Sequence, residues 1–313
     1  MRKVTRYLAF GYKINSQIEF NELPFLIGDR KYPELDILLV DLKDELNNFK
    51  NNGEVEFQIN KDKVSFLVPK IALFSIEGAK IIKVYILNEQ RMDVVKLFTL
   101  GTCIGILLLQ RKILPLHGSA IEINGKAYAF IGHSGAGKST LASAFIQKGY
   151  KLISDDVIPV TVDSSNHPVV IPAYPQQKLW KASLDEFQID STQLKPLFER
   201  ETKFAIPVTD HFSTKEIPLV GVFELTKTAE NDAVEITSIS KLQSLRTLYF
   251  HTYRNFLLND MRLIDWHFKF TAKILERIFV NEISRPISRF TTDELILQIL
   301  ECVSKEEKEV ANT

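Results

Sequence analysis

The chain has 313 residues, which is enough to bury a large core as one big domain or two modest ones. Its 39 lysines and arginines balance 39 aspartates and glutamates, so no net field attracts nucleic acid or an anionic membrane. The two cysteines, Cys103 and Cys302, lack metal-binding or redox spacing, which favours buried thiols in a reducing compartment.

The N-terminal part of the chain is predicted to be rich in β-strands. Three of its first six residues are charged (Arg2, Lys3 and Arg6), and no apolar core follows them, so we expect no signal peptide and a cytoplasmic protein. Residues 1–88 alternate short apolar runs with turn signals, as at 37–40, 55–59 and 63–68. This pattern predicts a meander of antiparallel strands.

The most apolar stretch covers residues 97–109. It is too short to span a bilayer and ends in Gln110-Arg111-Lys112. A core helix that starts at about Met92 is therefore predicted, with no membrane association.

A hairpin is predicted next, because Asn124-Gly125 separates the apolar runs 119–123 and 126–131 and both turn positions of such a pair favour positive φ. The second strand leads into a segment that fits the phosphate-binding pattern G-x-x-x-x-G-K-[ST]. An Ala/Leu-rich helix over 139–147 follows, and Gly149 is its expected end. Strand, loop and helix are the arrangement that the motif requires. Since a hairpin precedes the loop instead of a helix crossover, the sheet is predicted to be mixed.

Each residue type in this loop suits phosphate binding. Its glycines allow backbone conformations that place N–H groups around phosphate oxygens. Lys138 can reach the β- and γ-phosphates, and the Ser139 hydroxyl can bind Mg²⁺. His133 stands at a variable position, where exposure is more expected than catalysis. The predicted nucleotide-binding residues are Gly132, His133, Ser134, Gly135, Ala136, Gly137, Lys138, Ser139 and Thr140.

Two aspartates are predicted to lie beside the loop. Asp155 follows Lys138 by 17 positions, which a helix of about ten residues and a return strand of about five would occupy. Asp155 and Asp156 are thus expected at the end of that strand. One carboxylate can hold a metal ion and the other can accept a proton from an attacking hydroxyl. Without the phosphate loop, a turn or a helix cap would be the better explanation of two adjacent aspartates, but the loop favours the catalytic role. His117, at the loop side of the hairpin, could assist at the phosphate or be a structural histidine.

Strands are predicted further on at 169–173, 203–207 and 217–225, helices between 240 and 280, and a last helix after Thr291. The fold class is therefore α/β (α+β with a mixed sheet), with a β-rich N-terminal part and a helical C-terminal part. The predicted bounds are 1–90, 91–235 for the core with the phosphate loop, and 236–313, forming one integrated unit.

The order and spacing of three segments resemble the HPr kinase/phosphorylase family. They are 117–125, the loop motif, and 148–156, and the resemblance covers 115–160. It implies a kinase fold related to phosphoenolpyruvate carboxykinase and ATP-dependent phosphorylation of a serine hydroxyl on a peptide or protein. It also implies that Lys138 contacts phosphate, that Ser139 and Asp156 hold Mg²⁺, that Asp155 is the base, and that His117 helps at the phosphate.

The chain also departs from that family. A glycine-rich Glu-x-Arg-Gly-Leu-Gly signature is missing after the aspartates, where 174–180 and 203–207 stand instead, and the N-terminal region differs. Both differences argue against HPr as the substrate and against a reverse phosphorylase reaction. The chain looks closer to the HPr-kinase-like proteins of lasso-peptide clusters, which implies the C-terminal serine of a precursor peptide as acceptor.

Several alternatives stay open. They are an HPr serine kinase, a small-metabolite kinase, and a nucleotide-dependent sensor or NTPase. Lys203 and Arg254 are cations in apolar surroundings, which makes them candidate contacts to substrate or phosphate, although ordinary surface charges explain them too. A homo-oligomer is also compatible with the sequence.

Overall fold

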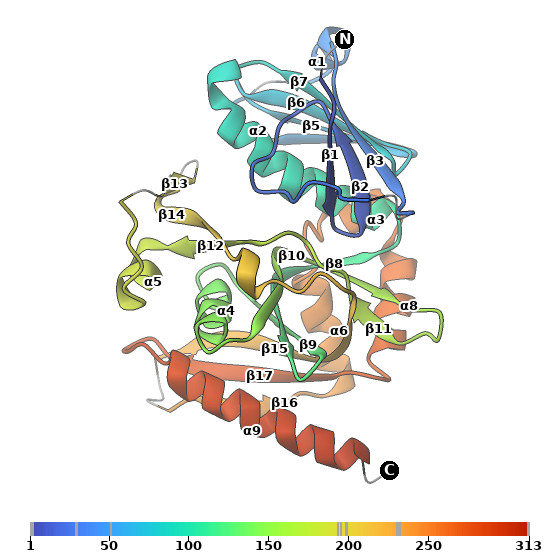
Figure 1. Ribbon diagram of the computed structural model, residues 1–313. Coiled ribbons are helices and arrows are strands. Elements are labelled where there is room, and N and C mark those ends of the chain that lie inside the picture. The colour runs from blue at the N-terminus through green and yellow to red at the C-terminus, as the bar shows by residue number, and fades with distance from the viewer. Residues whose placement is uncertain are drawn as a thin grey trace.

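The computed structural model describes residues 3–28, 31–50, 52–192, 194, 196–197, 200–229 and 233–311. An N-terminal sheet with its own helix lies above a larger sheet that has helices on both faces, and a small third sheet projects from the side (Figure 1). This arrangement confirms the predicted α/β class with a mixed sheet.

The N-terminal sheet has seven strands in the order β1-β2-β3-β7-β6-β5-β4. The β-rich prediction is confirmed, but a purely antiparallel meander is wrong, because β3 runs parallel to both β2 and β7. The long connection before β3 lets this strand run parallel to β2, and the one after it leads to β4 at the far edge of the sheet. Sequence periodicity does not record which strands pair. The strands are β1 (Thr5–Ala9), β2 (Tyr12–Ser16), β3 (Glu34–Leu39), β4 (Glu56–Asn60), β5 (Lys63–Val68), β6 (Ala72–Glu77) and β7 (Ile81–Ile86), with the short helix α1 (Lys43–Leu46) between β3 and β4.

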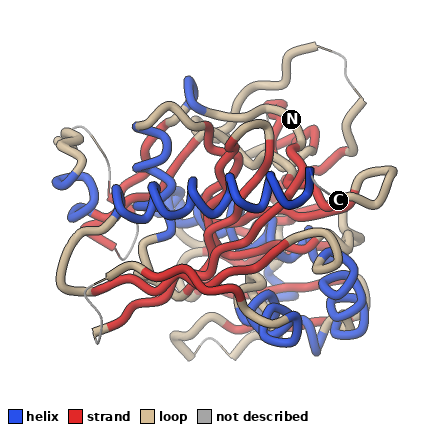
Figure 2. Tube along the Cα trace, turned by 90° about the horizontal axis from the view of Figure 1, so that it is seen from below, coloured by secondary structure: helices blue, strands red, loops and turns tan. Residues whose placement is uncertain are grey.

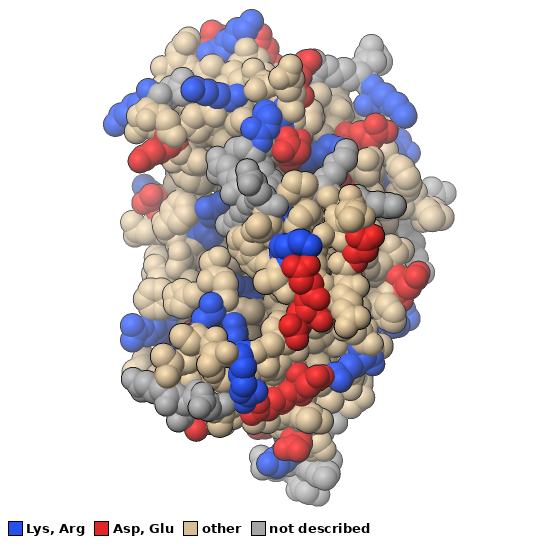
Figure 3. All heavy atoms as spheres, turned by 90° about the vertical axis from the view of Figure 1, so that its left-hand side faces the viewer, with Lys and Arg blue, Asp and Glu red and all other residues tan. Residues whose placement is uncertain are grey.

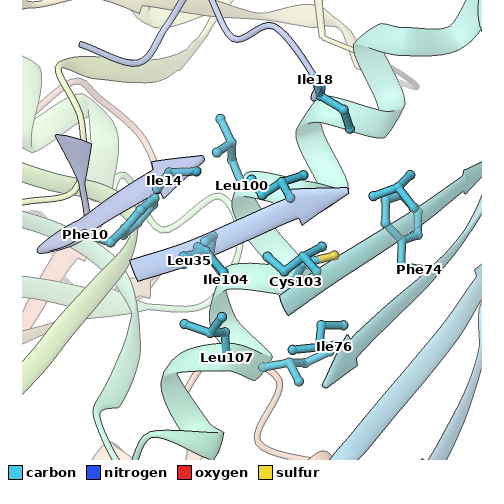
Figure 4. Close-up of a cluster of buried hydrophobic side chains, with 14 of the residues drawn as sticks. Phe10, Ile14, Ile18, Leu35, Phe74, Ile76, Leu100, Cys103, Ile104 and Leu107 are labelled. Atoms are coloured by element: carbon cyan, nitrogen blue, oxygen red, sulfur yellow. The ribbon is translucent and has the colours of Figure 1, made fainter. Parts of the chain in front are cut away.

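The predicted core helix is confirmed as a continuous helical segment that packs on this sheet. After the 3₁₀ turn η1 (Glu89–Arg91), it comprises α2 (Met92–Phe98), a π-helical turn η2 (Thr99–Cys103) and α3 (Ile104–Gln110). Its buried side chains meet those of β2, β3 and β6 (Figure 4). The helical segment Glu89–Gln110 is long and apolar enough to cross a membrane, but 72% of its most apolar stretch is buried inside the protein.

The second sheet contains the phosphate loop and has the order β11-β10-β8-β9-β15-β17-β16. β11 also pairs with β15, so five strands close into a ring. The predicted hairpin is confirmed, since Asn124 and Gly125 have φ values of 52° and 74° between antiparallel β8 and β9. The strands are β8 (Leu114–Ile123), β9 (Lys126–Gly132), β10 (Lys151–Val162), β11 (Pro168–Val170), β15 (Ile217–Thr228), β16 (Glu235–Ser238) and β17 (Phe279–Pro286).

Alternating side chains of β9 build a core on each face of this sheet. Tyr128 and Phe130 pack with α4 (Lys138–Gln147) and α9 (Thr292–Ala311), while Ala129 and Ile131 pack toward α6 (Lys241–Phe250) and α8 (Ile264–Ile274). Seen from below, α9 lies across the strands (Figure 2). A short helix, α7 (Leu257–Asp260), joins α6 to α8.

Four strands escaped prediction: β16 and β17 in the second sheet and two strands of the third sheet. β17 lies between β15 and β16, in a stretch between the predicted helices where no strand was predicted. β12 (Gln176–Trp180) follows Tyr174-Pro175, in a stretch where no strand was predicted, and forms the third sheet with β13 (Pro196–Leu197) and β14 (Arg200–Pro207). The 3₁₀ turn η3 (Thr209–His211) follows, and α5 (Lys181–Glu186) comes directly after β12. The predicted domain bounds stay a prediction.

The face shown in Figure 3 mixes Lys and Arg with Asp and Glu. This mixture agrees with the formal net charge of zero and provides no large single-sign field on that face.

Gly118 in β8 provides a stability prediction. A Cβ at this position would clash with the backbone carbonyl of Phe130 in the paired strand. Gly118→Ala is therefore expected to lower the free energy of unfolding by at least about 3 kcal/mol, because the clash is with backbone that cannot rotate away. Gly78→Ala is the control, since its surroundings are open and its φ of +57° costs only about 1–2 kcal/mol. If urea denaturation shows that Gly118→Ala and Gly78→Ala lower the free energy of unfolding equally, the close approach of β8 and β9 is contradicted.

Candidate active site

The phosphate loop connects β9 to α4, as the motif predicted. Gly132, Gly135 and Gly137 have φ values of 144°, 79° and 108°, a region that favours glycine. A Cβ at Gly132 would lie 2.5 Å from the carbonyl oxygen of Leu225, so close strand packing also requires glycine there. The loop is thus shaped by its glycines to present backbone N–H groups at the start of α4.

Lys138 is folded into this loop. The side chain is only 8% exposed, and Nζ donates to the carbonyl oxygens of Gly132 at 2.8 Å and His133 at 3.0 Å. Burial lowers the pKa of Lys138 to about 8, although Asp155 and Asp156 oppose the shift. A cation is therefore held where phosphate oxygens would lie.

The two aspartates lie in the middle of β10, not at its end, so this part of the prediction is wrong. Asp155 is opposite Ser119 and Asp156 is opposite Gly118 in the β8 pairing. The register shifts between Leu152 and Ser154, and Asp156 has a φ of +76°. These irregularities interrupt the strict alternation of side chains along the strand, and both aspartates line one cavity.

Asp155 is bonded to the loop serine. Its Oδ1 accepts hydrogen bonds from Ser139 Oγ at 2.9 Å and Ser119 Oγ at 2.6 Å, and its Oδ2 accepts one from the backbone N–H of Lys178 at 2.8 Å. A hydroxyl and a carboxylate side by side are the oxygen ligands that Mg²⁺ uses together with substrate phosphates. No group of three or more His, Cys, Asp or Glu that could hold a metal occurs within the searched, described residues.

Asp156 instead forms a buried ion pair. Its Oδ2 lies 2.7 Å from Lys178 Nζ and its Oδ1 lies 3.6 Å from His117 Nδ1. Burial acts to raise the pKa of Asp156, but the charges of Lys178 and His117 outweigh it and hold that pKa well below the usual range. Burial lowers the pKa of His117, against the influence of Asp156. Asp156 therefore stays ionised beside the loop.

Sequence reasoning missed two cations of the site. Lys178 comes from β12, and Arg285 comes from β17, where its Nε donates to the carbonyl oxygen of Ala136 at 2.8 Å. Burial lowers the pKa of Arg285. Both residues lie on strands that were not predicted. Neither Gln176–Trp180 nor Phe279–Pro286 alternates strictly between apolar and polar residues, so no local signal in the sequence marks them.

A cavity of about 770 Å³ brings the predicted site residues together. This volume is within the range of small-molecule sites, about 300–1,000 Å³. Every predicted site residue except Ala136 lines it, including His117, Lys203 and Arg254. His133, Ser134 and Gly135 are exposed in the loop. The individual chemical roles stay predictions.

The cavity also has walls from outside the phosphate loop. Leu97, Phe98 and Thr102 come from the N-terminal helical segment, and the segment His251–Phe256 follows α6. Lys203 on β14 is paired opposite Trp180 and lies 5.5 Å from the centre of its ring. The helical segment Glu89–Gln110, which packs on the N-terminal sheet, therefore contributes to the site.

The chain is similar to a curated HPr kinase/phosphorylase of Mycoplasmopsis pulmonis, with 37% identity over 82 residues, 24% of this chain. The match spans about a quarter (26%) of that relative's length. The motif-based resemblance to the HPr kinase/phosphorylase family is thereby confirmed over this segment. No family model matches. The solved structure of the HPr(Ser) kinase/phosphatase from Coxiella burnetii aligns over 63% of this chain and 98% of its own, with 16% identity and a TM-score of 0.34.

Proposed function

From the resemblance to the HPr kinase/phosphorylase family, we propose that the chain is a phosphotransferase that moves the γ-phosphate of ATP to a serine hydroxyl of a peptide or protein. The observation that carries the proposal is the contact of 2.9 Å between Ser139 and Asp155, next to Lys138 and in one cavity with Asp156. A nucleotide-phosphate loop with two nearby carboxylates is what transfer to a hydroxyl requires.

Mg²⁺, when bound, would neutralise charge on the phosphate oxygens, and Ser139 and Asp155 would hold it. The N–H groups at the start of α4 and the ammonium of Lys138 would bind the phosphates. Transfer of this kind needs positioning and charge stabilisation more than covalent help from the protein.

The contacts suggest a division of labour between the aspartates. The resemblance implied Asp155 as the base and Asp156 on the metal side. Since Asp155 is the residue bonded to Ser139, we propose the reverse: Asp155 serves the metal side, and Asp156 orients the acceptor hydroxyl and takes its proton. His117, at 3.0 Å from the carbonyl oxygen of Asp156, would help to position that residue.

As the acceptor we propose the C-terminal serine of a lasso-peptide precursor, on the resemblance described above. Incubating the protein with labelled ATP, a precursor peptide with or without its terminal serine, HPr and a metabolite panel tests this. Label on the serine-terminated peptide alone is the expected result. Label on HPr or on a metabolite would show that this molecule, and not the peptide, is the acceptor. ATP hydrolysis with no labelled acceptor would favour an NTPase. Cytoplasmic location and a homo-oligomer stay predictions.

A further inference from the structure

The wall of the cavity formed by Arg254 points to a second binding function. We propose that Arg254 binds a carboxylate of the acceptor, close to the hydroxyl that receives the phosphate. The inference rests on the proposed kinase function and names the chemistry of its substrate: an acceptor with an anionic group next to its serine-type hydroxyl.

The segment that contains Arg254 is held in place by backbone hydrogen bonds to the start of β8. The backbone N–H of His117 donates to the carbonyl oxygen of His251, and that of Tyr253 donates to Pro115, each at 2.7 Å. Arg254 itself has a φ of +57°, a conformation that costs a non-glycine residue about 1 kcal/mol or more. The segment after α6 is therefore fixed against the start of β8, with Arg254 in an unfavourable backbone conformation.

The guanidinium of Arg254 lies 5.5 Å from the centre of the Tyr253 ring but has no acidic partner among the described residues. Its Nη2 donates to Thr102 Oγ1 at 2.9 Å, and its Nε is buried without a hydrogen-bond partner. No carboxylate among the described residues lies within ion-pair distance of it. A buried donor left unpaired costs about 1–3 kcal/mol. Backbone strain and an unmet donor at one half-buried cation, inside the candidate site, are what a ligand-binding residue shows.

Arg254 lies on the side of the cavity that the N-terminal part builds. Thr102, its partner, belongs to the π-helical turn, and such turns are frequent at functional sites. Tyr253 packs against the same segment so closely that a Cβ at Gly105 would lie 2.6 Å from its ring. Phe256, 52% exposed, extends this wall with an edge contact of 5.3 Å to Phe57. The wall thus offers a cation next to apolar surface.

The phosphate side of the cavity already has its own cations. Lys138 is folded into the loop, and Arg285 is bonded to the loop at Ala136. Arg254 is bonded to Thr102 of the N-terminal helical segment and not to the loop, so it is better placed for the acceptor than for the nucleotide.

Charge counting across the cavity supports an anionic acceptor. Seven of the described lining residues are Lys, Arg, Asp or Glu: the cations Lys138, Lys178, Lys203, Arg254 and Arg285, and the anions Asp155 and Asp156. The surplus is three positive charges. A surplus of this sign suits anionic ligands, which are the nucleotide phosphates first and an anionic acceptor beside them.

The experiment uses one set of acetylated tetrapeptide sequences that end in serine. One pool of these peptides has a free C-terminal carboxylate, and the other has a C-terminal carboxamide. Phosphate transfer from MgATP is measured by mass spectrometry. Binding of the same pools is measured with Mg²⁺ and a non-hydrolysable ATP analogue. For the unmodified protein we expect a preference of about 10- to 100-fold for free acids, the range of a charge-assisted hydrogen bond. Arg254→Gln should reduce it to within about twofold, and Arg254→Lys should keep most of it.

Arg262→Gln is the matched control, since Arg262 is exposed, shares a φ of +57° and lies outside the cavity. It should keep the full preference. No free-acid preference in either measurement, or a preference that survives Arg254→Gln, would overturn the carboxylate subsite. A free-acid preference in binding, lost in Arg254→Gln, with no transfer to any peptide would support the subsite and refute the serine-kinase function. Thermal unfolding of each variant shows whether it is folded.

Discussion

Asp155→Asn is expected to lower kcat for phosphate transfer by about 100- to 10,000-fold. The Asp155 carboxylate accepts hydrogen bonds from Ser119, Ser139 and the backbone of Lys178, and an amide keeps part of this network without the charge. Folding and nucleotide binding in the absence of metal should change little. Transfer to the acceptor, with fluorescent-nucleotide binding as a parallel measurement, checks this prediction.

The magnesium dependence separates the two possible roles. If Asp155 serves the metal side, its Asn variant should need at least about tenfold more Mg²⁺ for half-maximal nucleotide binding. Asp156→Asn should then lower kcat while keeping the wild-type magnesium dependence. The opposite pattern would return Asp155 to the role of base and Asp156 to the metal, as the family resemblance implied.

Asp156→Asn needs its own control for stability. It leaves Lys178, whose side chain is 8% exposed, as a buried charge without its partner. Breaking such a pair costs about 3–5 kcal/mol, so the variant must be measured well below its melting temperature. The double variant Asp156→Asn/Lys178→Met removes both charges and separates lost stability from lost catalysis.

Lys138→Met is expected to lower kcat/KM by about 100- to 1,000-fold, because it removes the cation that the loop holds at the phosphates. Lys148→Met is the control, since Lys148 is an exposed lysine just after the same helix and pairs with Asp293 on the surface. Transfer rates of the two variants are compared under identical magnesium and nucleotide concentrations. A loss of similar size in Lys148→Met would show that removal of any nearby charge is sufficient.

The pKa of Lys138 adds a dependence on pH. In the empty site this pKa is lowered to about 8, so the ammonium is charged below that pH and loses its proton as the pH rises through it. Bound phosphate favours the charged form. The affinity for MgATP should therefore fall as the pH rises above about 8, with uptake of a proton on binding. In Lys138→Met this part of the pH dependence should vanish. Parallel curves for both proteins would contradict the prediction.

The parts of the site that the sequence predicts are those formed by neighbours in the chain. The Asn124-Gly125 hairpin, the loop glycines and the helix from Lys138 depend on turn chemistry and local spacing, and all are confirmed. The aspartates were expected at a strand end because periodicity does not reveal a register shift or a left-handed residue within a strand. The spacing of 17 positions after Lys138 was still sufficient to predict that both aspartates lie beside the loop.

The missed parts depend on contacts between distant segments. Lys178 and Arg285 belong to strands without strict alternation of apolar and polar residues, and their place is set by pairing with distant strands. Thr102 joins the cavity only because the N-terminal helix packs over the segment that contains Tyr253 and Arg254. No local pattern in the sequence contains this information.

The closed ring of strands has a consequence for synthesis on the ribosome. β8, β9 and β10 pair with close neighbours in the chain, so the loop and both aspartates can assemble as soon as residues 114–162 have emerged. The other edge of β9 stays open until β15 arrives about 50 residues later, and β11 completes the ring only then. Arg254 on the acceptor wall is made later still, and so is Arg285, which is bonded to the loop at Ala136. During translation, the loop and both aspartates thus precede Arg254, with a strand edge exposed to wrong pairing in the interval.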